Sequence, residues 1–226
     1  MTGPGCGPGE PAGAVPLNSA KMVCVSSPDA KADLQRYLQL SREALVWKLE
    51  GLGAYDLRRP LVPTGTNLLG LVKHVAGVEA DYLGTTFGRP FDEPLPWMEE
   101  DAEPNADLWA TLDESRDSVV ALYRRVWAHS DQTIATFGLD AVGRVPWWPD
   151  EHSEVTLHRV LVHVIAENNR HAGHADIVRE LIDGSAGLRS DSDNLAPGDA
   201  QWWTAYRERL EAVARAAAGS DSQVLR

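Results

Sequence analysis

Apolar residues recur at helical spacing along most of the chain after residue 28. Intervals of three, four and seven residues place such side chains on one face of an α-helix. The pattern predicts five helices, which are separated by loops rich in glycine and proline. Their expected ranges are about 29–53, 66–82, 106–134, 153–183 and 200–218.

Two of these helices have local signals at their ends. Thr66 is suited to cap the second helix, because its hydroxyl can accept a backbone N–H of the first turn. Gly184 follows the last apolar position of the fourth helix and is its expected C-terminal stop. No stretch shows convincing strand alternation. The predicted fold class is therefore all-α, an up-and-down four-helix bundle with an additional C-terminal helix.

The length and composition indicate one bundle domain, over residues 29–219. The chain has 226 residues, of which 43% are hydrophobic and 24% are charged, close to the average for globular proteins. Residues 1–28 are rich in Gly, Pro, Ala and Ser, so we expect a disordered leader, within which Met22 is an alternative start. Residues 220–226 are the expected flexible tail.

Charge and cysteine content exclude several classes of protein. The net charge of −12 argues against nucleic-acid binding, which needs a clustered basic surface. Cys6 and Cys24 precede every periodic segment, so they cannot frame a disulfide scaffold or a cysteine-rich zinc site. No apolar run approaches the roughly 18 residues that span a membrane, and no secretory signal is present. We therefore expect a cytoplasmic protein.

The fourth predicted helix places metal-ligand side chains inside an apolar run. Glu167 and His171 are four residues apart, so a carboxylate oxygen and an imidazole nitrogen can reach one cation from the same helix face. His74 stands in a second apolar run, on the second helix. Two histidines and one carboxylate leave positions open for water or substrate, which is typical of a catalytic site. The alternative is a core hydrogen-bond cluster, in which Glu167 pairs with Arg170 or a histidine.

The other histidines need separate weighing. His163 and His174 each lie about one turn from a predicted ligand, and a four-ligand site would be closed, so we favour supporting or pocket roles for both. Gly173 costs helix propensity in the middle of a helix, which indicates close approach of another backbone or of a ligand. Three further histidines are expected at the surface: His129, His152 and His158.

Tryptophan pairs occur at two places outside these motifs. Trp147 and Trp148 stand between prolines, where they can line a pocket mouth or plug one end of the bundle. Trp202 and Trp203, on the last helix, favour a docking surface over a substrate platform. The chain lacks the HExxH motif of zinc proteases, a glycine-rich phosphate loop and a GxSxG elbow.

Residues 66–79 and 163–184 resemble the two signatures of the DinB/YfiT-like metalloenzymes. The first includes Leu-Leu-Gly-Leu-Val-Lys-His-Val-Ala-Gly-Val-Glu, and the second ends in Arg-His-Ala-Gly-His-Ala-Asp-Ile-Val-Arg-Glu-Leu-Ile-Asp-Gly. The resemblance covers about residues 34–184. It implies a four-helix bundle, often dimeric, with zinc or nickel held by one histidine of the second helix and two ligands four apart on the fourth. By position, these ligands are His74, Glu167 and His171.

One departure from most relatives points to a particular branch of that family. Many relatives have histidine where this chain has Glu167, and the glutamate form resembles the mycothiol-dependent maleylpyruvate isomerase branch. A carboxylate ligand favours a harder, more oxygen-preferring metal. His174 stands where many relatives have glutamine, which supports a pocket role over ligation.

The resemblance implies an enzyme that uses a low-molecular-weight thiol, such as mycothiol or bacillithiol, in S-transfer or isomerisation. A metal lowers the pKa of a bound thiol and so supplies thiolate at neutral pH. His163 and His174 are the candidates for moving protons. Expected partners are the thiol, an electrophilic substrate and a second copy of the chain, without nucleic acid or membrane. The alternatives are a hydrolase that uses metal-bound water, and a non-catalytic stress or partner-binding protein.

Overall fold

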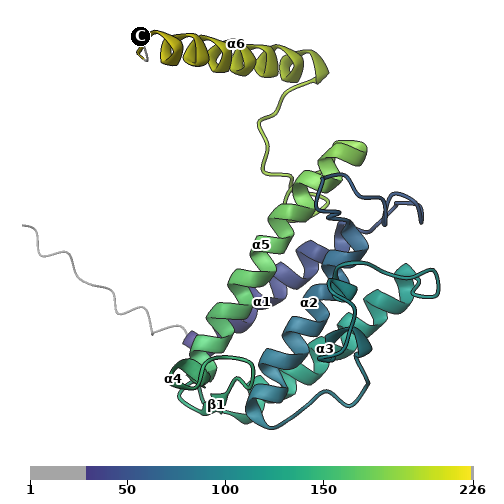
Figure 1. The fold of residues 1–226 in the computed structure, drawn as a ribbon, viewed down its shortest axis with the longest axis vertical. Coiled ribbons are helices and arrows are strands. Elements are labelled where there is room, and N and C mark those ends of the chain that lie inside the picture. The colour runs from purple at the N-terminus through teal and green to yellow at the C-terminus, as the bar shows by residue number, and fades with distance from the viewer. Residues whose placement is uncertain (1–28, 225–226) are drawn as a thin grey trace, which may run out of the picture.

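A computed structural model describes residues 29–224, which form a mainly helical protein (Figure 1). The predicted helical class is thereby confirmed. Within the described range, α2 (Leu68–Leu83) packs against α3 (Arg116–Thr136) and α5 (Leu157–Asp183), and α5 also packs along α1 (Ala30–Trp47). The predicted leader, residues 1–28, lies outside the described residues together with both cysteines and Met22.

Helix ends follow the capping side chains. α2 begins after Asn67 and not after Thr66, because the Asn67 side-chain oxygen accepts the N–H of Gly70 at 2.8 Å. α5 ends at Gly184, which adopts the left-handed conformation with φ 80° and confirms the predicted stop. Local hydrogen bonds therefore fix each end to within a residue or two.

The third predicted helix begins ten residues later than expected. Ser115 caps α3 by accepting the N–H of Ser118, and the segment before it holds only a short 3-10 helix, η3 (Ala106–Leu108). Leu112, an apolar residue within the predicted range of this helix, lies before the observed start and is 95% exposed. Two more 3-10 helices occupy the preceding loop: η1 (Thr85–Phe87) and η2 (Pro96–Met98).

A small antiparallel sheet precedes α5, so the prediction of no strands was wrong here. The expected start of the fourth helix splits into α4 (Asp150–Ser153) and the strand β2 (Glu154–Thr156). β2 pairs with β1 (Val142–Arg144), with Gly143 opposite Val155. Strands of three residues are too short for alternation to be recognised in a sequence.

Buried apolar side chains form two clusters, which contact different halves of α5. The larger involves α1, α2, α3 and the C-terminal half of α5, and the smaller involves the N-terminal half of α5 and the β1–β2 hairpin. Between α1 and α2, the guanidinium of Arg42 binds the carboxylate of Glu79, and both side chains are buried. The core therefore contains an ion pair as well as apolar contacts.

The last helix, α6 (Ala200–Val224), stands apart from the other helices (Figure 1). It continues past the predicted end at residue 218 and includes most of the expected tail. The Trp202 ring stacks on Tyr206 at 5.2 Å, and Trp203 contacts both rings edge-on, so these aromatic groups pack on one another. Over residues 29–224, no helix is long and apolar enough to cross a membrane.

Candidate metal centre and adjoining pocket

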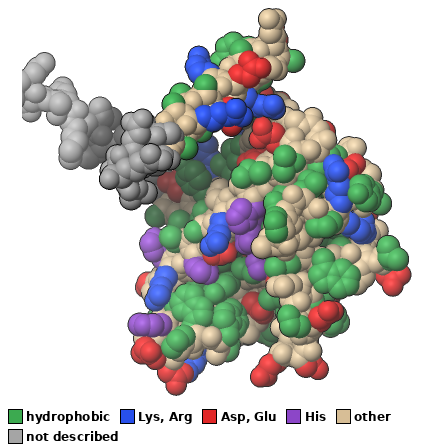
Figure 2. Space-filling view, turned by 45° about the horizontal axis from the view of Figure 1, so that its top comes forward, with side chains coloured by type: hydrophobic (Ala, Val, Ile, Leu, Met, Phe, Trp, Pro, Cys, Tyr) green, Lys and Arg blue, Asp and Glu red, His purple; other side chains and the backbone are tan. Residues whose placement is uncertain are grey.

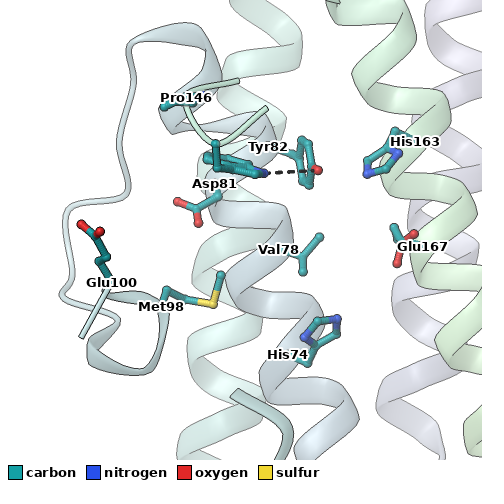
Figure 3. A pocket seen from close by; sticks show the side chains of 10 residues that line it. His74, Val78, Asp81, Tyr82, Met98, Glu100, Pro146, His163 and Glu167 are labelled. Carbon is teal, nitrogen blue, oxygen red and sulfur yellow. Dashed lines mark hydrogen bonds between the residues drawn. The ribbon is translucent and has the colours of Figure 1, made fainter. Parts of the chain in front are cut away.

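Helices α2 and α5 bring the three predicted ligand residues together. The rings of His74 and His171 meet edge to face, with centroids 4.6 Å apart. The His171 Nε2 lies 3.5 Å from the Glu167 Oε2. Figure 3 shows His74 on α2 and Glu167 on α5 facing each other across a pocket. Figure 2 shows histidine side chains gathered on one face of the protein, next to hydrophobic side chains.

The donor set fits a divalent metal ion in its chemistry. The Nδ1 of His171 is buried and has no hydrogen-bond partner among the described residues, which is uncommon because such a group loses its bonds to water. Imidazole nitrogens and carboxylate oxygens are the usual ligands of such ions. Within residues 29–224, however, no three His, Cys, Asp or Glu side chains already stand in ligating positions. The three side chains therefore have to reorient to bind an ion.

His171 is a neutral imidazole at neutral pH. Burial lowers its pKa to about 4, and the neighbouring His74 acts in the same direction, while the carboxylate of Glu167 opposes both. The contact between Glu167 and His171 is also the one that the hydrogen-bond-cluster alternative expects. Contact alone therefore does not separate the two interpretations, although a hydrogen-bond cluster leaves the Nδ1 of His171 without a partner among the described residues.

Asp107 adjoins this cluster and was missed in the sequence. Its Oδ2 lies 2.6 Å from the Nδ1 of His74, so it holds the ring orientation and leaves Nε2 toward the pocket. Asp107 belongs to η3, which rests on α2 because Gly70 has no side chain: a Cβ there would overlap the carbonyl oxygen of Leu108. In the sequence, Gly70 of the first motif was the available signal that another segment packs closely on this helix.

Asp107→Asn is expected to weaken the affinity for a divalent ion about 10- to 100-fold while the fold is kept, because the ring loses its charged partner. Competition with a chromogenic chelator measures the affinity. Asp140→Asn, at an exposed position, is the matched control and should leave it unchanged. Equal affinities of the two variants would show that Asp107 does not support the site.

A cavity of about 960 Å³ opens beside the cluster and is lined by residues of α2, α5 and two loops. His163 lines it and packs against Tyr82, with ring centroids 4.6 Å apart. The predicted pocket role of His163 therefore matches its position. The lining residues are His74, Val78, Asp81, Tyr82, Met98, Glu100, Pro146, Trp147, His163 and Glu167.

Of the two tryptophans in the loop before α4, one lines the pocket and the other packs at the end of the core, so each of the two roles that the sequence left open is filled. Trp147 lines the cavity and is half exposed, whereas Trp148 is partly buried against the smaller core cluster. Both indole groups donate to the hydroxyl oxygen of Tyr82, Trp148 at 3.0 Å and Trp147 at 3.5 Å. One tryptophan is thus a pocket wall, and the other fills the end of the core.

The remaining histidines lie outside the cavity lining. His174 is exposed, and its ring contacts that of His171 with centroids 5.5 Å apart. His152 and His158 are exposed, as predicted. The prediction for His129 was wrong, because it is half-buried and its Nε2 binds a backbone carbonyl, that of Arg89, at 2.7 Å.

The interpretation of Gly173 as a point of close approach of another backbone was also wrong, and close approach of a ligand stays a prediction. Gly173 is exposed, and within residues 29–224 no atom of another element lies within 4 Å of a Cβ built there. Gly173→Ala is therefore expected to stabilise the protein by about 0.5–1 kcal/mol, because alanine has the higher helix propensity. Urea unfolding measures the change. A loss of stability would show that a partner outside this chain approaches the helix here.

Comparison with known families matches the part of the chain that builds this site. Residues 33–184 match the family described as mycothiol-S-transferase. The match contains α2, α5 and both sides of the cavity, and ends at Gly184, the C-cap of α5. No curated protein matches the chain. The resemblance of the two motifs is thus confirmed, and the chain belongs to the mycothiol S-transferase family, which is DinB/YfiT-like.

Proposed function

We propose that this protein is a metal-dependent enzyme that transfers mycothiol, or a similar low-molecular-weight thiol, to an electrophile, or uses that thiol in an isomerisation. The observation that supports it most is the meeting of His74, Glu167 and His171 within the segment that matches the family. Two of them, His74 and Glu167, also line a large cavity. In this proposal α1, α2, α3 and α5 form a DinB-like up-and-down four-helix bundle. The resemblance also underlies the proposal of a homodimer, and the cytoplasmic location remains the prediction made from the sequence.

Each residue of the site has a proposed task. His74, Glu167 and His171 would hold the ion, zinc or nickel, and Asp107 orients the first of them. A bound divalent ion lowers the pKa of a thiol and supplies thiolate at neutral pH. His163 accepts and returns the proton, because it lines the cavity.

His174 is the weaker candidate for proton transfer. It contacts the ring of His171 and does not line the cavity, so we assign it to the support of that ring. The cavity volume lies at the upper end of the range for small-molecule sites, so there is room for the thiol and its electrophile together.

Thiol transfer by the purified full chain tests the proposal. Elemental analysis gives the metal content, and the assay follows conjugation of mycothiol to the fluorogenic reagent monochlorobimane. We expect turnover that needs both the thiol and the metal, and that is lost after chelation and restored by zinc or nickel. Ester hydrolysis without thiol would instead favour the hydrolase alternative. A protein that neither contains nor takes up a divalent ion would rule out the metal-dependent mechanism.

A further inference from the structure

The side of the cavity away from the proposed metal ligands is acidic. Asp81 and Glu100 lie on the side of the cavity that faces the loop after α2, whereas Glu167 lies on α5 (Figure 3). No lysine or arginine is among the described residues that line the cavity. The guanidinium of Arg159 lies over the ring of Trp148, 5.2 Å from its centroid, and Arg159 does not line the cavity. On this side of the cavity, an anionic electrophile would therefore meet like charges, with no lysine or arginine in the described lining to compensate them.

The hydroxyl of Tyr82 has a proton to donate into this cavity. A phenol oxygen can accept two hydrogen bonds and donate one. The oxygen of Tyr82 already accepts from Trp148 Nε1 and, at longer range, from Trp147 Nε1. Its proton has no acceptor in the part of the chain that the structure describes. A carbonyl oxygen of a substrate would fill this vacant position.

The wall around this hydroxyl is aromatic and apolar. The ring of Tyr82 meets that of Trp147 nearly edge-on, with centroids 5.1 Å apart and an interplanar angle of 77°. Val78, Met98 and Pro146 line the adjoining surface. Flat apolar groups pack well against an exposed indole face. The cavity therefore combines one hydrogen-bond donor, an apolar wall and a negative rim.

We propose that the electrophile is an uncharged, apolar α,β-unsaturated ketone, whose carbonyl oxygen accepts a hydrogen bond from Tyr82 and whose body contacts Trp147. This assignment rests on the proposed thiol transfer. The thiolate sulfur forms a bond to the β-carbon as the C=C π bond breaks, and the electron pair moves to the carbonyl oxygen. Tyr82 stabilises the resulting enolate, and His163 returns the proton of the thiol to the α-carbon. The product is a saturated thioether, without an oxidant or a leaving group.

Two unsaturated ketones, one of which carries an additional carboxylate, test this assignment. The full-length, metal-loaded protein is assayed with mycothiol and either 4-phenylbut-3-en-2-one or its para-carboxylate. We expect kcat/KM at least about tenfold higher for the uncharged ketone, and a ratio within about threefold in the double variant Asp81→Asn/Glu100→Gln. Tyr82→Phe should lower kcat about 100-fold, because it removes the donor to the enolate oxygen. Tyr37→Phe, on the exposed face of α1, is the matched control and should leave kcat unchanged.

Binding without thiol separates this assignment from the proposed function. Calorimetry with the saturated ketone 4-phenylbutan-2-one should show binding that Tyr82→Phe weakens about fivefold, the effect of one neutral hydrogen bond. Equal turnover of the two unsaturated ketones, or full activity of Tyr82→Phe, would overturn the assignment even if transfer to monochlorobimane persists. A third outcome is that the saturated ketone binds, and Tyr82→Phe weakens this binding, but the protein transfers thiol to no electrophile. That outcome would support the carbonyl site and overturn the proposed transferase.

Discussion

Glu167→Gln and His171→Ala are each expected to abolish stable binding of a divalent ion and to lower thiol transfer by at least about 1,000-fold. Either change leaves two of the three proposed ligands. An uncharged amide is a poor substitute for a carboxylate, although its size is the same. Without the ion, the thiol regains a pKa above neutrality and loses most of its thiolate.

Elemental analysis and the bimane assay measure both effects on the same protein samples. His158→Ala is the matched control, because His158 is an exposed histidine at the start of the same helix and should keep metal and activity. Circular dichroism checks that each variant remains helical. Full metal content in Glu167→Gln or His171→Ala would show that the ion is held elsewhere.

The sequence predicted the members of the candidate site better than its surroundings. Glu167 and His171 were recognised because four-residue spacing fixes their relation on any helix. Their meeting with His74 required the additional expectation that the second and fourth helices adjoin, which the α2–α5 contact supports. Asp107 could not be found in this way, because its contact with His74 joins a loop and a helix 33 residues apart.

The differences in the fold come from short-range interactions that hydrophobic spacing does not report. Asn67 moved one predicted helix start by about one residue and Ser115 moved another by ten, because a side-chain cap outweighs the weak apolar pattern that precedes it. Leu112 then fell in the loop before α3 and became exposed. For Gly173, the low helix propensity of glycine was taken as a sign that another backbone or a ligand approaches closely, although the position is exposed and no other backbone in the described part of the chain lies near it.

Arg42→Met is expected to lower the free energy of unfolding by about 3–5 kcal/mol, because it leaves the carboxylate of Glu79 buried without a counter-ion. The Arg42 Nη2 lies 2.6 Å from the Glu79 Oε1, and its Nε lies 3.2 Å from the Oε2. The two side chains are 1% and 0% exposed. Asp131 adds a third contact to the guanidinium, at 3.0 Å, but is partly exposed and so keeps its hydration when Arg42 is removed.

The chain offers a matched control for this effect in Arg125 and Glu93, which also form a two-point pair but are about half exposed. Arg125→Met should cost less than about 1 kcal/mol, because both charges of that pair remain in water. Urea unfolding of the single variants and of the double variant Arg42→Met/Glu79→Leu measures these changes. The double variant should recover most of the free energy of unfolding that Arg42→Met loses, because no charge then stays buried alone. Equal costs for the two arginine substitutions would mean that the Arg42 pair joins α1 to α2 without governing stability, and that the desolvation argument fails for this core.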